Sequence, residues 1–203
     1  MAYIGSKPAD KPVVASDLDP TIITGQTALA TAPADTDEFL ISDAGVLKRL
    51  DASLIGGTNT PAFQATKSSS QTVSHATNTK ITFDTETFDT NNAFASSKFT
   101  VPSGQGGNYY IYNLLLASRS TDSDMYRIKS MLYKNGSQVQ EVALNLAGTD
   151  GRDLFVNLII TLSLSAGDYL EIYTNAASSS TSSISIIGGS AITSVFGAYK
   201  LIT

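Results

Sequence analysis

The chain has 203 residues, no cysteine, one histidine and a formal net charge of -5. Only 15% of the residues are charged, whereas 42% are hydrophobic, so the chain can bury a substantial core and relies on Ser, Thr, Asn and Gly for its polar surface. The acidic balance gives no basic footprint for nucleic acid, and the lack of cysteine excludes disulfides, thiol catalysis and cysteine-based metal sites.

The chain shows neither of the two common membrane signals. Its first ten residues contain no apolar run of the kind that forms a secretory signal peptide. No stretch approaches the roughly 18 consecutive apolar residues that a membrane helix needs. We therefore expect a soluble protein without membrane insertion, which does not leave its cell by the standard export route.

Residues 1–57 form the first predicted region. They contain four prolines and many small residues, and their apolar residues, such as Val13, Val14, Ile22 and Ile23, are too dispersed to build a core. Such a segment is extended and poorly ordered unless something holds it. We expect an N-terminal arm that sister chains or a larger assembly keep in place.

The end of this arm is more structured. Two apolar runs, residues 39–41 and 46–50, flank the turn sequence Asp43-Ala44-Gly45, which indicates a short hairpin. A short helix over residues 47–54 is the alternative. The glycine-rich residues 56–61 then read as a linker, so we divide the chain into an arm, residues 1–57, and a domain, residues 58–203.

The domain has the pattern of strands throughout. Turn residues separate short apolar segments at close intervals, without a helical period, and this is typical of a sandwich or barrel. Asn135-Gly136 specifically predicts a type I′ hairpin turn. The predicted strands cover residues 62–65, 71–73, 80–84, 93–101, 108–118, 125–134, 138–147, 152–163, 169–174, 183–187 and 191–202.

Two of these strands are apolar on both faces. In residues 109–116 and 154–164, large side chains occupy both alternating sets of positions. A two-layer sandwich buries only one face of each sheet, and the chain has no helices to cover the other, so a second copy of the chain is the expected cover. The residues predicted to form the trimer interface and core are Tyr109, Tyr110, Ile111, Tyr112, Leu115, Phe155, Leu158, Ile159 and Tyr199.

A series of short segments in the domain resembles a known family. In order they are PAF (61–63), KITFD (80–84), FDTNNAF (88–94), FTVP (99–102), GNYYI (107–111), KNG (134–136), LSLSAGDYL (162–170) and FGAYKLI (196–202). This order resembles the C1q/TNF-like jelly roll, specifically the C1q-like globular head. The resemblance implies an all-β antiparallel jelly-roll sandwich that forms a homotrimer.

The chain also departs from that family. Ile111 stands where the family usually has Phe, and the glycine-rich residues 104–107 make a looser turn. The Gly-x-y triplets of a collagen-like stalk are missing. This argues against a complement-like or hormone-like member of the family.

The arm has a resemblance of its own. Residues 15–25 and 34–50 are similar to segments of bacteriophage tail-fibre and appendage proteins. A bacteriophage origin would agree with the expected lack of a signal peptide, since virions assemble in the cytoplasm. It implies that the arm attaches a C1q-like tip to the particle.

Catalytic signals are weak. His75 lies in a polar stretch, no G-x-S-x-G elbow occurs, and we interpret His75 as a surface loop residue. The glycine-rich residues 104–107 precede a strand, so they are a turn and not a phosphate cradle. We expect no enzymatic activity and no cofactor.

Several acidic side chains could offer oxygens to calcium. Asp122 with Asp124, Asp150 with Asp153, and the set Asp84, Asp89 and Asn91 are the candidates, but none matches EF-hand spacing. Solvated turns are the preferred interpretation. We therefore predict no metal site.

These observations predict a structural protein of a bacteriophage virion, exposed on the tail or capsid as a short trimeric fibre. Distal loops of the trimer would contact a glycan or receptor on the host. The alternatives are a purely structural role, as a capsid decoration, head fibre or tail connector, and, least favoured, depolymerase activity. The residues predicted to attach the arm to other virion proteins are Val13, Val14, Ile22, Ile23, Phe39 and Ile41.

Overall fold

The structure is a computed structural model that describes residues 25, 27, 33–34, 36–55, 59–119, 122–147, 150–189 and 193–202. The chain divides into two compact units, residues 1–56 and 57–203. In the described residues all regular structure is β, apart from one 3₁₀ turn at Ala52–Leu54. None of their helical segments is long and apolar enough to cross a membrane. The predicted all-β fold is confirmed.

The first unit contains a two-stranded hairpin. Strands β1 (Glu38–Asp43) and β2 (Val46–Asp51) pair antiparallel around Ala44-Gly45, whose φ angles of 50° and 83° fit a type I′ turn. The predicted hairpin is therefore confirmed. The alternative helix over residues 47–54 is wrong, because residues up to Asp51 pair with β1 and only Ala52–Leu54 coil.

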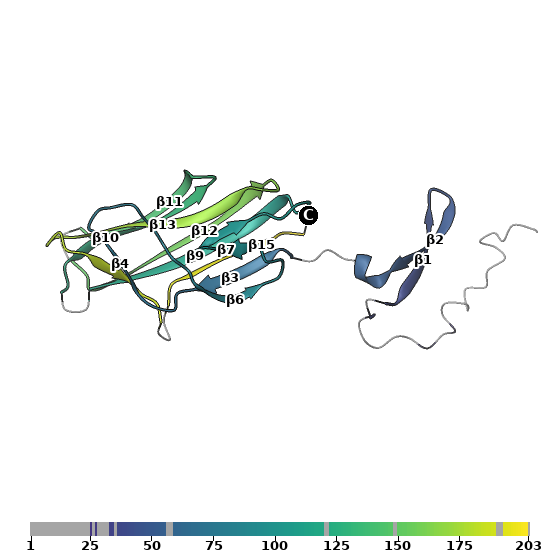
Figure 1. The fold of residues 1–203 in the computed structure, drawn as a ribbon, viewed down its shortest axis with the longest axis horizontal. Coiled ribbons are helices and arrows are strands. Elements are labelled where there is room, and N and C mark those ends of the chain that lie inside the picture. Colours follow the sequence, from purple (N-terminus) through teal and green to yellow (C-terminus); the bar gives the residue numbers. More distant parts are fainter. Residues whose placement is uncertain are drawn as a thin grey trace, which may run out of the picture. The chain divides into compact units, whose positions relative to one another are not determined.

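The second unit is a sandwich of two antiparallel sheets (Figure 1). The larger sheet has the order β4-β14-β9-β15-β3-β6, with β12 on the other side of β9, and the smaller has the order β11-β10-β13-β8-β7, with β5 also beside β13. The larger sheet comprises β3 (Ala62–Thr66), β4 (Gln71–Val73), β6 (Thr85–Asp89), β9 (Gly107–Ser118), β12 (Asp153–Leu164), β14 (Ile184–Ile186) and β15 (Val195–Lys200). The smaller comprises β5 (Thr79–Lys80), β7 (Phe94–Ala95), β8 (Lys98–Thr100), β10 (Met125–Lys134), β11 (Ser137–Asn145) and β13 (Tyr169–Ser178).

Aromatic rings from both sheets fill the core. Phe63 of the larger sheet stacks on Phe94 and Phe99 of the smaller sheet, with ring centroids 4.7 and 4.9 Å away. Phe196 meets Phe63 edge to face at 4.9 Å. Such packed pairs add to the free energy gained by burying the rings. These four phenylalanines join the two sheets into one domain.

A buried amide also joins the sheets. Asn113 of β9 accepts a hydrogen bond from the Ser130 hydroxyl of β10 across the sandwich, with the two oxygens 2.5 Å apart. The Asn113 Nδ2 donates to the carbonyl of Val195 on β15 at 3.1 Å. A buried polar group without such partners would destabilise the fold. Asn113 therefore fixes one position of β9 against both neighbours.

Four residues predicted for the trimer interface and core lie inside the subunit's own core. Tyr109, Ile111, Leu115 and Leu158 are fully buried without any second chain. They occupy the alternate positions of β9 and β12 that face the smaller sheet. Burial raises the pKa of Tyr109 to about 12. These four therefore belong to the core part of that prediction, because the smaller sheet covers one face of each central strand within the chain.

The predicted strand over residues 80–84 is wrong beyond its first residue. After β5 the chain leaves the smaller sheet and crosses to the larger one as β6, a strand that the sequence pattern did not predict. Side chains replace the ladder at the crossing: the Lys67 ammonium donates to Thr82 O at 2.6 Å and Gln71 bonds Lys80 O and Thr82 N. Burial lowers the pKa of Lys67. These contacts explain why an apolar run here does not extend the strand.

The predicted strand over residues 93–101 is two short strands. Ser96 and Ser97 have φ angles of 52° and 57°, so the chain reverses between β7 and β8. The Ser97 hydroxyl bonds both the N–H and the carbonyl of Phe83. The remaining predicted strands are found with ends shifted by a few residues.

Two turns are clamped together at one end of the sandwich. Asn135 and Gly136 have φ angles of 53° and 79°, which confirms the predicted type I′ turn. The Asn135 side chain then bonds Asp168 and the N–H of Tyr169 in the turn before β13. The Lys134 ammonium lies 2.8 Å from Asp168. The bonds from Lys134, Ser165 N–H and Asn135 lower the pKa of Asp168 to about 2.

This clamp predicts an acid-sensitive contribution to stability. Because the pKa of Asp168 is lower in the folded chain than its ordinary 3.8, its carboxylate stabilises the fold above about pH 4, and that stabilisation is lost as the pH falls toward 2. Asp168→Asn should lower the melting temperature at neutral pH and flatten its decline between about pH 4 and 2. Thermal unfolding across this pH range checks it, with the exposed Glu86→Gln as the matched control. An unchanged acid profile in Asp168→Asn would contradict the assignment.

Candidate functional site

The outer face of the larger sheet carries a row of large uncharged side chains. Strand register aligns Ile159 with Tyr112, Tyr112 with Gly197, Gly197 with Gln64, and Gln64 with Phe88. Cross-strand neighbours on one face contact each other. Five strands, from β12 to β6, thus contribute to a single surface, which we call the association face. Its other large members are Tyr110, Leu114, Phe155, Val195 and Tyr199.

Three tyrosines form the centre of this face. The Tyr110 ring centroid lies 5.2 Å from that of Tyr199 and 6.2 Å from that of Tyr112. The Tyr112 hydroxyl donates to Gln64 Oε1 at 2.9 Å. Burial and the two neighbouring tyrosines raise the pKa of Tyr112. The ring contacts and the bond to Gln64 therefore hold the cluster as a preorganised aromatic surface.

The Tyr112 ring packs directly against the backbone of Gly197. A Cβ atom at Gly197 would lie 2.3 Å from Tyr112 Cζ and 2.4 Å from its hydroxyl oxygen, so only glycine lets the ring lie across β15. This position brings the Tyr112 hydroxyl within reach of Gln64 on the next strand. The flat surface of the association face thus depends on a residue with no side chain.

The outer face of the smaller sheet differs sharply. It carries paired charges: Lys80 with Glu171 at 2.6 Å, and Lys129 with Glu141 at 2.7 Å. Arg127 also donates to Asn175 at 2.8 Å. Removing such charges from water is costly. The rings of Tyr133 and Tyr173, 4.2 Å apart, lie among these charges, so burying this face against another protein would also bury charged groups, whereas the rows of the larger sheet described above carry none.

At the periphery of the association face the apolar residues are open to solvent. Phe155 and Ile159 of β12 are 51% and 54% exposed, and Phe88 of β6 is 45% exposed. Exposed apolar clusters of this kind mark protein interaction sites. The tyrosines, in contrast, are half-buried by their own neighbours.

The structure thus brings together five of the predicted interface residues: Tyr110, Tyr112, Phe155, Ile159 and Tyr199. The sequence pattern missed Gln64, Phe88 and Gly197. Phe88 and its strand were hidden because residues 85–89 are mostly polar. Gly197 carries no chemical signal of its own, and its role follows only from the register with Tyr112.

Of the residues predicted to attach the arm, Phe39 and Ile41 lie on the same face of hairpin β1–β2. Val13, Val14, Ile22 and Ile23 lie outside the described residues. The structure therefore gives a setting for only two of the six.

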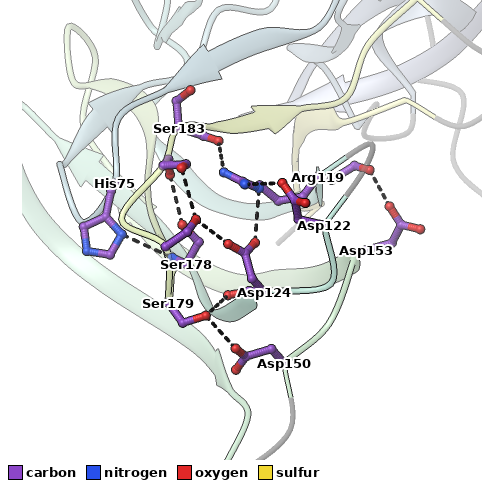
Figure 2. Close-up of polar contacts among 12 residues, drawn as sticks. His75, Arg119, Asp122, Asp124, Asp150, Asp153, Ser178, Ser179 and Ser183 are labelled. Atoms are coloured by element: carbon purple, nitrogen blue, oxygen red, sulfur yellow. Dashed lines mark hydrogen bonds and ion pairs between the residues drawn. The ribbon is translucent and has the colours of Figure 1, made fainter.

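Apart from the association face, a cluster of polar side chains lies where β9 ends; Figure 2 shows its contacts. Strand β9 starts beside Lys200, whose N–H bonds Pro61 O where the domain begins, and ends at Ser118, about 35 Å away for a twelve-residue strand. Arg119 follows immediately and leads into the loop before β10. The loops that meet here are therefore the distal loops of the domain.

Arg119 holds these loops together. Its guanidinium donates to Ser183 O at 2.9 Å and Asp122 Oδ2 at 2.7 Å, and its Nε lies 3.1 Å from Asp124 Oδ1 as an ion pair (Figure 2). The Arg119 side chain is only 10% exposed. One buried cation thus connects the loops before β10 and before β14.

The other distal acids are also engaged. Asp150 accepts from the Ser179 hydroxyl at 2.8 Å, and the Ser179 N–H donates to Asp124 O at 2.8 Å. Asp153 accepts from the hydroxyl of Ser118. Among the described residues, no three acidic or histidine side chains converge as a cation site. These acids thus have donors within the protein, and Asp122, Asp150 and Asp153 are also exposed to solvent.

The other candidate calcium residues have partners as well. Asp84 accepts from the N–H and hydroxyl of Ser68, both at 2.6 Å, and these bonds lower the pKa of its carboxyl. Asp89 accepts from the N–H groups of Asn91 and Phe94. Both carboxylates thus accept hydrogen bonds from backbone N–H groups of nearby turns.

His75 has a structural contact that the sequence did not predict. Its Nδ1 accepts a hydrogen bond from the N–H of Ser178 at 3.2 Å, which ties the segment after β4 to the end of β13 (Figure 2). The ring is half-buried. His75 is therefore a contact between two segments rather than a free loop residue.

Comparisons with known proteins define the fold. No protein-family model matches the sequence, and the comparison with curated proteins returns no match. Solved structures that resemble the chain include murine APRIL, with 10% identity and a TM-score of 0.51 over 69% of this chain and 98% of that one. The Eiger TNF of S. frugiperda has 16% identity and a TM-score of 0.50 over 70% and 90%. The globular domain of the zebrafish complement 1qA protein has 17% identity and a TM-score of 0.47 over 70% and 98%.

The larger unit is therefore an antiparallel jelly roll with the C1q/TNF-like fold that the segment order suggested. At these identities the likeness defines the fold alone. The association face and the distal loops are features of this chain's own side chains.

Substituting Gly197, against which Tyr112 packs, should disrupt the association face. We expect Gly197→Ala to displace the Tyr112 ring and break its bond to Gln64, at a cost of about 1–3 kcal/mol in the free energy of unfolding. In a Tyr112→Ala background the same substitution should cost much less, because the clashing atoms are gone. Denaturant unfolding of the two single variants and the double variant measures this. Additive effects would show that the clash is not the cause.

Proposed function

We propose that this chain is a non-enzymatic structural protein that assembles as a homotrimer through the association face. The observation that carries the proposal is the contrast between the two outer faces: one bears ion pairs, and the other bears Phe88, Phe155, Ile159 and three tyrosines without any charge in their rows. Burying apolar area stabilises by about 25 cal/mol per Å². Over an interface of obligate size this term exceeds any surface ion pair.

The proposed setting is the surface of a bacteriophage particle, on its tail or capsid. Support comes from the sequence of residues 15–25 and 34–50, which is similar to tail-fibre and appendage proteins. The N-terminal unit would attach the trimer to other virion proteins, and the distal loops would contact a host glycan or receptor. The position of those loops at the end of β9 remote from Pro61 suits contact with an outside partner.

A purely structural role, as a capsid decoration, head fibre or tail connector, is the second candidate. The distal acids favour it, because Asp124, Asp150 and Asp153 are all bound to donors within the chain. Such a cluster stabilises loops without offering free carboxylates to a ligand.

The trimer is tested by a charge placed on the association face. Ile159→Asp should leave the domain folded but convert a trimer into monomers, since Ile159 is exposed in the single chain and an unpaired carboxylate resists burial. Val139→Asp, at an apolar residue of β11 that is 42% exposed, is the matched control and should remain trimeric. Sedimentation at micromolar concentration, with circular dichroism for folding, gives both readings.

One outcome of this test would contradict the proposal. A folded wild-type monomer would overturn the homotrimer. Leu158→Asp is a different experiment, because Leu158 is fully buried in the subunit and its substitution should unfold the chain itself.

Host attachment is tested by the distal loops. Wild-type trimer should bind host cells or their surface glycans, and Arg119→Met should lose that binding while it stays trimeric, because the loop clamp is gone but the association face is intact. Glycan-array or cell-binding measurements check this. Equal absence of binding in both proteins would favour the structural role. Cleavage of a host polysaccharide by the wild-type chain would contradict the non-enzymatic proposal.

A further inference from the structure

Hairpin β1–β2 exposes apolar side chains that nothing within its own unit's described residues covers. Phe39, Leu40 and Val46 are 41%, 73% and 59% exposed. Phe39 pairs with Leu50, Ile41 with Lys48, and Asp43 with Val46, so these six residues share one face, which we call the hairpin face; Leu40 lies on the opposite face. A two-stranded ribbon alone is marginally stable in water, and three or more strands with an apolar face are needed. The hairpin therefore requires a partner.

The charges of the hairpin indicate what kind of partner fits. Lys48 bonds Asp43, and Arg49 lies 3.1 Å from Glu38, so both cations of the hairpin are paired within it. An oppositely charged surface would gain little from such a ribbon. In the described part of the chain, β1 and β2 pair only with each other, so both outer edges can accept a further strand. A second copy of the hairpin, with free strand edges and with both of its cations already paired, matches both features.

We propose that the hairpins of three copies pack together through the hairpin face and form a six-stranded base. This inference rests on the proposed trimer, and it goes beyond it by giving Phe39 and Ile41 a sister hairpin as their contact. Six strands that pack through Phe39, Ile41 and Leu50, with the half-exposed Asp43–Lys48 ion pairs left toward the turns and the solvent, satisfy the requirement that one hairpin alone does not meet. The surface offered to other virion proteins is then the outside of this base and the residues before it.

Covalent connection favours sister hairpins over any free partner. Ten residues, from Ala52 to Pro61, connect β2 to β3, and they span at most about 35 Å. Strand β3 belongs to the sheet of the association face, so in a trimer the three connectors start from one assembled surface. Short tethers of this kind give effective concentrations of about millimolar. A modest mutual affinity of the hairpins is then sufficient for association.

The absence of cysteine makes a direct test possible, because every introduced thiol is unique in the chain. Val46→Cys places a thiol on the hairpin face, and Leu40→Cys places a more exposed one on the opposite face of the same hairpin. Under mild oxidation of the full-length protein, Val46→Cys should form disulfide-linked pairs of chains at least tenfold faster than Leu40→Cys. Thr181→Cys, in a distal loop, is the control for random collision and should remain unlinked.

A second variant separates hairpin packing from trimer formation. Adding Phe39→Asp to Val46→Cys should abolish the rapid linkage while sedimentation still reports a trimer, because the association face is untouched. Equal linkage rates for Val46→Cys and Leu40→Cys in a trimer would overturn the hairpin proposal and leave the proposed function standing. A trimer without linkage at Val46→Cys would also overturn it, and would point to a different virion protein as the occupant. Rapid linkage in a protein whose domain is monomeric would support the hairpin contact and overturn the trimer through the association face.

Discussion

The structure depends on the interdigitation of phenylalanines between two sheets. Ring centroids lie within 6.1 Å of each other among Phe63, Phe94, Phe99 and Phe196. Two of these rings come from β3 and β15 of the larger sheet, and two come from β7 and β8 of the smaller sheet. This packing uses one face of each sheet and leaves two outer faces for the solvent. The chain treats those faces differently: it covers one with ion pairs and leaves the other neutral and aromatic.

The alternation of side chains predicted much of this arrangement. Strand period assigned the two faces of β9 and β12 correctly, and Asn135-Gly136 specified its turn, because both signals are local. The pattern did not say which face the subunit covers itself, so the prediction grouped Tyr109, Ile111, Leu115 and Leu158 with Tyr110 and Tyr112 as interface and core residues alike. That decision depends on the second sheet, whose position is a tertiary fact.

Three other features lay outside the reach of local patterns. The crossing between sheets at residues 81–84 depends on Lys67, Gln71 and Ser97, which replace the strand ladder with side-chain bonds. The polar strand β6 is held by pairing rather than by its own composition. The contacts of Arg119 in the distal loops join segments up to 64 residues apart in the sequence. In each case long-range contacts determine the role of a residue that has little signal alone.

The contacts of Arg119 and Ser179 determine which positions of the distal loops can change in sequence. The Arg119 guanidinium donates to the main-chain oxygen of Ser183, and the Ser179 N–H donates to that of Asp124. These two bonds do not depend on the side chains of the residues that accept them. Thr181 is exposed with a φ of 60°, so residues that tolerate this conformation, such as Gly, Asn or Asp, can replace it while the backbone path is retained. Substitutions at exposed loop positions would change the surface chemistry of these loops and keep their shape.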